Sequence, residues 1–279
     1  MKIHQLRNAT AILSIGPHRL LLDPMFSDPG SLPGFRMRGG ERRRNPLVPL
    51  PAGIDAALEE VTGVLITHEH LDHLDSPARK WIRQRQLPVW ASSVDVPNLH
   101  SKGLDAREVL DNDLGLGVEV IPARHGRGLL GWLMGPVSGF YLVYDGEPSL
   151  YITADSILDD GVRDVLATLR PELVLAPAGS ANFGFGSDIL FSEDELVELT
   201  RLSPGQVIFH HLESIDHCPT TRKGLRQRLD AEGLGEKVYI PEDGAVLEFS
   251  SEGSEANAPP RPVAPRKPGF QKWVASKMG

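Results

Sequence analysis

The feature that most constrains this chain is the stretch VLITHEHLDHLD, residues 64–75. Its first four residues are apolar or β-branched and predict a short buried strand. His68, His70, Asp72 and His73 follow directly. Imidazole binds zinc, iron and manganese, and carboxylate binds harder ions. A strand that ends in these side chains predicts a metal centre, and the fold must then bring further ligands to this strand end.

The spacing inside the stretch favours two ions over one. His68 and His70 alternate, so in extended backbone both point to the same side and can hold one ion. Asp72 and His73 come after a turn and would face a second ion nearby. The alternative is a surface group of histidines without function. With 10 His in 279 residues, chance produces this spacing in roughly one sequence in a hundred.

Three later predicted strands end in residues of the same chemistry. Residues 117–122 are followed by His125 and residues 149–153 by Asp155, while residues 206–210 end in His210 and are followed directly by His211. A carboxylate in the place of Asp155 can bridge two ions. The spacing alone leaves either histidine of the pair as the last ligand.

The composition limits the class of protein. The net charge of −8 argues against a nucleic-acid partner, which usually meets a basic face. Cys218 is the single cysteine, so an internal disulfide is excluded, and we expect it to be buried without a catalytic role. The N-terminal residues lack the apolar core of a signal peptide, and no apolar run is long enough for a membrane span. We therefore expect a cytoplasmic protein.

Strand and helix patterns extend over residues 1–250, which we expect to form one domain. The predicted helices are residues 54–60, 77–85, 94–102, 159–169, 193–202 and 220–229. Residues 251–279 begin with SSEGSEANAPPRPVAPRKPG, a composition that cannot form a core. We expect a Pro-rich linker and a short tail without stable structure, whose apolar end could bind a protein partner.

Two loops are candidates for contact with the substrate. Residues 25–50 contain five arginines in an acidic chain, and guanidinium groups suit anions. We predict that Arg42, Arg43 and Arg44 bind an anionic substrate, with a solvated charged loop as the alternative. Residues 127–138, RGLLGWLMGPVS, are too apolar for a free loop. They would line a substrate pocket or pack under the sheet.

THEHLDH, a later His125, Asp155 after a strand and a final strand-end histidine together resemble the metallo-β-lactamase superfamily, from Met1 to about Ser250. Within it, the chain looks like the branch of ascorbate-6-phosphate lactonase and N-acyl-phosphatidylethanolamine phospholipase D. The stretches LRNAT, LLLDPMFS, MGPVSGF, AGSANF and HLESIDHCPTTR resemble bacterial members. The resemblance implies an α/β fold, a four-layer αββα sandwich with the metals at one edge between the two sheets.

The resemblance also implies roles for the ligand residues. The first ion would be held by His68, His70 and His125, the second by Asp72, His73 and His211, and Asp155 would bridge them. His211 is favoured over His210 because HLES matches the stretch after the ligand in related sequences. Ala154 stands where the family often has Gly, and Ser156 where it often has Thr. We expect two divalent ions, zinc before manganese or iron.

These inferences predict a metal-dependent hydrolase. A hydroxide shared by the two ions would attack an ester, lactone or phosphodiester bond of a small anionic substrate. Asp72 would orient the nucleophile, and His217 would act as a general acid or bind the anion, unless its role is packing. The alternatives are an iron-dependent redox enzyme of the same fold and a metal-binding interaction module without catalysis.

Overall fold

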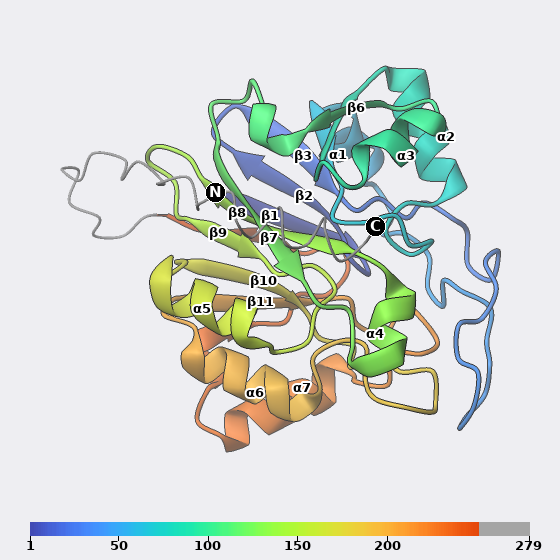
Figure 1. Cartoon of the computed structure of the whole chain (residues 1–279), viewed down its shortest axis with the longest axis vertical. Coiled ribbons are helices and arrows are strands. Elements are labelled where there is room, and N and C mark those ends of the chain that lie inside the picture. Colours follow the sequence, from blue (N-terminus) through green and yellow to red (C-terminus); the bar gives the residue numbers. More distant parts are fainter. Residues whose placement is uncertain (251–279) are drawn as a thin grey trace.

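The computed structural model describes residues 1–250; the predicted linker and tail lie outside them. Two β-sheets face each other, and helices cover the outer face of each (Figure 1). This arrangement confirms the predicted four-layer αββα sandwich. Within residues 1–250, none of the helices is both long and apolar enough to cross a bilayer.

The first sheet has seven strands in the order β13-β1-β2-β3-β4-β5-β6. Strands β1 to β3 form an antiparallel meander, and β3 to β6 run parallel. The strands are β1 (Lys2–Arg7), β2 (Thr10–Ile15), β3 (His18–Leu22), β4 (Gly63–Leu65), β5 (Pro88–Ala91), β6 (Asp105–Glu108) and β13 (Val246–Glu248). Helices α1 (Asp55–Glu59), α2 (Ser76–Arg85) and α3 (Val96–Ser101) cover its outer face, and the 3-10 turn η1 (Val109–Asp111) follows β6.

The second sheet has six strands in the order β12-β11-β10-β9-β8-β7. Strands β9 to β12 run parallel, and β7, β8 and β9 are joined antiparallel. The strands are β7 (Gly117–Ala123), β8 (Val137–Val143), β9 (Leu150–Ile152), β10 (Leu173–Pro177), β11 (Gln206–His210) and β12 (Val238–Tyr239). Helices α5 (Asp160–Thr168), α6 (Glu193–Leu202) and α7 (Arg222–Ala231) cover it, with the 3-10 turn η2 (Gly235–Lys237) before β12.

The central core forms where side chains of alternate strand residues meet between the sheets. Ile3 and Leu13 from the first sheet pack in one cluster with Phe140, Ile152 and Ile208 from the second. Residues of the opposite parity, such as Val64 and Val174, pack under the helices instead. Four layers follow because both faces of each sheet carry apolar residues.

Two elements differ from the sequence predictions. Residues 105–108 form β6, an edge strand whose charged residues hide the usual alternation. Residues 128–134 form helix α4 (Gly128–Met134) where we expected a loop, because the four glycines in and beside it and its lack of a polar face hide a helical pattern. Both are surface elements, so apolar periodicity gives little signal for them.

A buried arginine organises the long loop between β3 and α1. The Arg7 side chain is fully buried, and its guanidinium donates to the carbonyl oxygens of Met25, Ser27 and Val48 at 2.7 to 3.0 Å. Burial lowers its pKa to about 10, so the group stays charged at neutral pH. The guanidinium of Arg7 thereby holds both ends of the loop against the first sheet.

We expect Arg7→Met to destabilise the protein by about 3 kcal/mol, because two buried carbonyls and one half-buried carbonyl lose a charged donor. Urea denaturation would measure the change in the free energy of unfolding. The matched control is Lys80→Met on the exposed side of α2, which should change it by less than about 0.5 kcal/mol. Equal effects of the two substitutions would contradict the role of Arg7.

Candidate metal centre

Strand ends from both sheets meet at one edge of the sandwich. From the first sheet, Asp23 follows β3, and residues 68–73 follow β4. From the second, His125 follows β7, Asp155 follows β9 and His211 follows β11. A backbone bond from Ser138 N to Thr67 O joins the two sheets there. Residues distant in the chain therefore converge because their strands end at the same edge.

The nitrogen and oxygen atoms of these side chains form two adjacent groups. In each group the ligand atoms lie within 4.8 Å of one another. One group is His68, His70 and His125; the other is Asp72, His73 and His211. All are buried except His70, which is half-buried. These are the two sets that the resemblance to the superfamily implies.

Asp155 lies between the two groups. Its Oδ2 is 3.2 Å from His73 Nε2, 3.4 Å from His125 Nε2 and 3.9 Å from His68 Nε2. Its Oδ1 is 3.9 Å from His211 Nε2. One carboxylate thus faces both groups, which is the position a bridging ligand requires.

Each of the five imidazoles uses one ring nitrogen for a bond directed away from the centre. His70 Nε2 donates to Met134 O at 3.0 Å and His125 Nδ1 to Ile189 O at 2.7 Å. The Nδ1 atoms of His68, His73 and His211 lie 2.9 Å from Thr67 Oγ1, 2.9 Å from Asp23 Oδ2 and 3.6 Å from Cys218 Sγ. Such outer bonds orient metal-binding histidines and leave the other nitrogen free for a cation.

Asp23 and Thr67 connect the outer bonds of two histidines. Thr67 Oγ1 donates to Asp23 Oδ2 at 2.6 Å, and Thr67 N donates to Asp23 Oδ1 at 2.8 Å. With His73 Nδ1 this makes three bonds to one buried carboxylate. Asp23 also belongs to a possible ligand group with His68 and His73. We assign it to positioning, because these three donors occupy its oxygens.

Asp23 was a candidate from the sequence because it stands at a strand end, whereas Asn8 was not singled out. Its Nδ2 donates to Asp72 O at 3.1 Å, and its own carbonyl accepts from His211 N at 3.0 Å. The turn between β1 and β2 therefore holds the backbone of two ligand residues. Asn8 lies in LRNAT, one of the stretches that carry the resemblance, but a single Asn in a turn gives no spacing from which a role could be predicted.

Backbone strain gathers around the centre. Asp23, Ala154 and His211 have φ of 41°, 54° and 59°, in the left-handed region that non-glycine residues rarely adopt. For Ala154 this gives the physical reason why related sequences often carry Gly there. The surrounding contacts over-determine these conformations and place the adjacent ligand side chains.

Charge within the centre is balanced by protons when no cation is bound. Burial opposes the charge on His73, but Asp155 and Asp72 raise its pKa to about 10. Burial likewise opposes a raised pKa for His211, which Asp155 nevertheless holds well above its usual value. Burial lowers the pKa of His68 and of His125. Among residues 1–250, His73 Nε2 makes no hydrogen bond of good geometry, although it is buried and lies 3.2 Å from Asp155 Oδ2. Two carboxylates and an orphaned imidazole nitrogen fit bound cations.

His210 and His217 lie beside the two groups. His210 is buried outside both, and burial lowers its pKa to about 3, so His211 is the member of the pair that reaches the centre. His217 is buried with its ring stacked on Phe183, at 5.7 Å between centroids, and edge-on to Phe35 at 5.4 Å. Burial lowers its pKa to about 4, so it is neutral at physiological pH.

The arginine-rich loop is anchored beside His217. The Asp216 carboxylate accepts from the backbone N–H groups of Phe35 and Arg43 and from Asn45 Nδ2. Arg42 donates to Gly34 O and Arg44 to Ser31 O, so these guanidinium groups bond carbonyls of their own loop. All three predicted anion-binding arginines are exposed. Their role in substrate binding stays a prediction.

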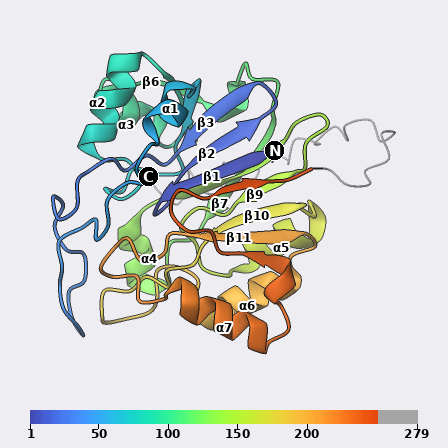
Figure 2. The same ribbon diagram turned by 180° about the vertical axis from the view of Figure 1, so that it is seen from behind.

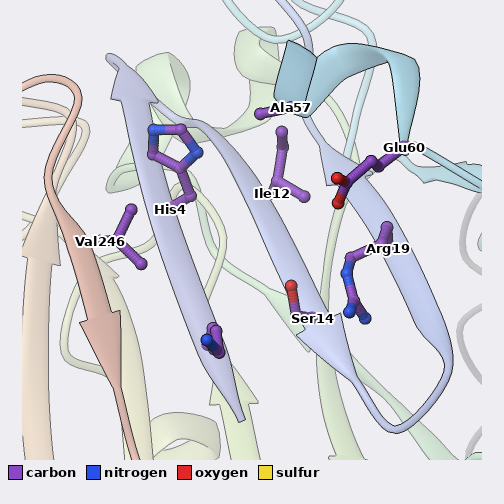
Figure 3. A pocket seen from close by; sticks show the side chains of 8 residues that line it. His4, Ile12, Ser14, Arg19, Ala57, Glu60 and Val246 are labelled. Atoms are coloured by element: carbon purple, nitrogen blue, oxygen red, sulfur yellow. The ribbon is translucent and has the colours of Figure 1, made fainter. Parts of the chain in front are cut away.

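A separate hollow of about 210 Å³ lies on the outer face of β1 to β3 (Figure 3). His4, Ile12 and Ser14 line it, and they point away from Ile3 and Leu13 in the core between the sheets. Its lysine, Lys2, is exposed and bonds Glu248 at 2.7 Å. Among residues 1–250, no cluster of metal ligands lies in this hollow, which is distinct from the centre at the strand ends.

The sandwich with this histidine and aspartate centre defines the class of metal-dependent hydrolases with a metallo-β-lactamase fold. The family profile described as a beta-lactamase superfamily domain matches residues 18–212. The chain therefore belongs to the β-lactamase superfamily and is a metal-dependent hydrolase, as the sequence predicts.

Relatives and solved structures agree with this assignment. The UPF0173 protein YddR of Bacillus subtilis (strain 168) is 31% identical over 256 residues, covering 89% of this chain and all of YddR. An isothiocyanate hydrolase from Delia radicum gut bacteria has a TM-score of 0.83 at 28% identity, covering 90% of this chain and all of that chain. A possible metal-dependent hydrolase from Veillonella parvula DSM 2008 has the same TM-score at 26% identity, covering 89% and 99%.

Proposed function

We propose that this centre holds two divalent cations, preferably zinc. We further propose that the enzyme hydrolyses a small apolar electrophile of the isothiocyanate class. The observation that carries the proposal is the arrangement of five imidazoles, each bonded outward through one nitrogen, around the carboxylate of Asp155. The first cation would be held by His68, His70 and His125, the second by Asp72, His73 and His211, and Asp155 would bridge them.

Two bound cations would supply an activated water and stabilise the charge that develops on the substrate. The protein would orient this chemistry with its own groups. Asp72 Oδ2, 3.2 Å from His211 Nε2, would accept a hydrogen bond from the attacking water. His217, held neutral between two aromatic rings, would donate a hydrogen bond to the substrate rather than attract an anion by charge.

The surroundings of the centre support an apolar substrate. Phe35, Phe183, Leu130 and Met134 pack together beside the ligand residues, while Arg42 and Arg44 bond their own loop. The similarity to an isothiocyanate hydrolase supports the same class. Addition of water to R–N=C=S followed by cleavage of the C–N bond yields an amine and carbonyl sulfide. A lactone, ester or phosphodiester of an anionic substrate is the alternative, which the charge of the exposed arginines would favour.

Purified protein loaded with zinc, manganese or iron should be assayed against benzyl and methyl isothiocyanate, lactones, phosphodiesters and thioesters. We expect amine release from the isothiocyanates and about two zinc ions per chain by elemental analysis. Turnover of phosphodiesters or lactones without isothiocyanate hydrolysis would overturn the substrate class. Full activity with one ion per chain would overturn the two-cation centre. A cytoplasmic location belongs to the same proposal and fits the single cysteine.

Metal uptake should depend on pH over an unusually wide range. Cations must displace protons from His73, whose pKa is raised to about 10, and from His211, whose pKa is also raised. These groups hold their protons below the raised values, so the apparent affinity should rise with pH by about tenfold per unit for each proton displaced. Ordinary histidines, near pKa 6.5, would let the affinity level off above about pH 7.5.

Titration against a competing chelator at pH 6.5, 7.5 and 8.5 would measure this dependence, with these pH values spanning the ordinary histidine range. A continued rise between the two higher values is expected. An apparent metal affinity that stops rising at the middle pH of this series would show that His73 and His211 are already neutral before metal binds.

A further inference from the structure

Helix α4 presents apolar side chains on two opposite faces. Leu130 and Met134, one turn apart, face inward and pack with the cluster that contains Ile189 and Phe183. Leu129, Trp132 and Leu133 share the other face, at spacings of three and four residues, and are 73%, 76% and 58% exposed. A surface helix normally turns polar residues outward, so the outer face of α4 requires an apolar partner.

Two neighbouring loops extend this outer face. Leu130 Cδ1 lies against Gly186, which joins α4 to the loop that contains Phe185. In turn, Met37 N and Arg38 N both donate to Phe183 O, which joins that loop to the arginine-rich loop. The three segments lie side by side in both views of the molecule (Figures 1 and 2). We call Met37, Leu129, Trp132, Leu133 and Phe185 together the apolar rim.

The residues of the apolar rim form a group on the surface and are not isolated exposed residues. Its five members are among eleven large apolar side chains that are exposed in residues 1–250. Isolated exposed apolar residues are normal on a soluble protein, but a group from adjacent segments marks an interaction surface. The rim therefore points to a binding partner with an apolar surface.

The charge around the rim identifies the kind of partner. The same segments, residues 36–44, 124–134 and 183–188, contain seven arginines and only two acidic residues, Glu41 and Asp188. The whole chain nevertheless has a net charge of −8. Glu195 pairs with Arg127 at 2.6 Å and Asp216 accepts from the backbone of the arginine-rich loop, but the other arginines still leave an excess of positive charge beside the exposed apolar side chains. A partner that combines apolar and anionic groups fits this surface.

We propose that the apolar rim docks on an anionic lipid surface. Trp132 and the leucines of α4 would enter the boundary between headgroups and acyl chains, and the arginines would pair with lipid phosphates. A second copy of the chain is disfavoured, because self-association through the rim would bring the two arginine groups together. The C-terminal segment is disfavoured by its charge, since residues 261–279 contain five basic and no acidic residues.

Docking in this way would place the metal centre next to the lipid. Helix α4 begins three residues after His125, and its Met134 carbonyl accepts from His70 Nε2. If the substrate is apolar, as the proposed function states, it would reach the centre from the membrane phase, where apolar molecules are concentrated. The docking itself rests only on the rim and its charge.

Co-sedimentation of the full-length protein with vesicles tests the proposal. One set contains phosphatidylcholine alone and the other equal parts of phosphatidylcholine and phosphatidylglycerol. We expect at least tenfold stronger binding to the anionic vesicles, weakening as salt is raised. Trp132→Glu should reduce this binding at least tenfold. The control Leu202→Glu, at an exposed apolar residue at the end of α6, should leave it unchanged. The tail is identical in all variants, so a selective loss belongs to the rim.

Tryptophan emission provides a readout that does not depend on a disruptive variant. Anionic vesicles should shift the emission of the wild-type protein to the blue, and Trp132→Phe should remove this shift while binding persists. Absence of vesicle binding at any salt concentration, or equal loss in Trp132→Glu and Leu202→Glu, would overturn the proposal. A dimer in sedimentation analysis that Trp132→Glu dissolves would instead identify a second copy, and would also overturn it.

Discussion

Asp155→Ala is expected to abolish binding of the second cation and to lower kcat by at least about 10³-fold, because its carboxylate faces both ligand groups. Elemental analysis and steady-state kinetics on the substrate found in the panel would measure the two effects. The same change should lower the pKa of His73 and His211, whose protons balance this carboxylate. In the variant, the affinity for the remaining cation should therefore depend less on pH.

The matched control for this experiment is Asp160→Ala, at the exposed start of α5. It removes the same group from the same region of the chain and should leave metal content and kcat unchanged. Circular dichroism would establish that both variants are folded. Two cations and full turnover in folded Asp155→Ala would show that the carboxylate does not bridge the ions.

Asp23→Asn is expected to weaken cation binding by about 10- to 100-fold, although Asp23 would not itself hold an ion. The amide has the size of the carboxylate but presents a donor where an acceptor is needed. In either orientation its NH2 group faces a donor, either Thr67 N or the pair Thr67 Oγ1 and His73 Nδ1, so the ring of His73 and, through Thr67, that of His68 lose their orientation. We also expect a loss of about 1–3 kcal/mol in the free energy of unfolding.

Competition with a chelator and urea denaturation would measure these two changes. Asp28→Asn, in the exposed part of the following loop, is the control and should alter neither. If Asp23 is a ligand rather than a positioning residue, the variant should lose one cation completely at saturating metal. Stoichiometry therefore separates the two roles, and an unchanged affinity would contradict both.

The sequence predicted the parts of the site that depend on residue type and strand ends. The group from His68 to His73 required more ligands, and His125, Asp155 and His211 follow predicted strands in the order that the resemblance implied. The structure brings all seven side chains together, and their binding of metal stays a prediction for the experiments above. The choice between His210 and His211 needed the turn after β11, which directs only His211 toward Asp72.

Residues that act through hydrogen bonds were harder to predict. Asn8 and Thr67 are small polar residues in a turn and after a strand, and many such residues in any sequence have no comparable role. Cys218 was expected to be buried, and it is, but its contact with His211 Nδ1 could not be inferred from a lone cysteine. Hydrogen-bond partners that are far apart in the chain leave no spacing signal.

For the loops, too, residue types predicted a general role, and tertiary contacts decided the arrangement. Residues 25–50 were predicted as an anion-binding loop from their arginines, but Asp216 and Arg7 decide how the loop is anchored. Residues 127–138 were predicted as an apolar segment, yet only the helix shows which residues face inward. Exposure of Trp132 next to the arginine-rich loop is a property of tertiary contacts.

By itself, the sequence determined the class of fold and the enzyme class through its resemblance to the superfamily. It also determined the set of candidate ligands, because strand ends and ligand chemistry are local in the chain. Tertiary structure alone decided which nitrogen of each histidine faces the centre, which residues orient those rings, and where apolar and cationic side chains share one surface. The physical reason is that both sheets end at a common edge. The strands bring together residues that are far apart in the chain, and their separation in the sequence does not predict the contact.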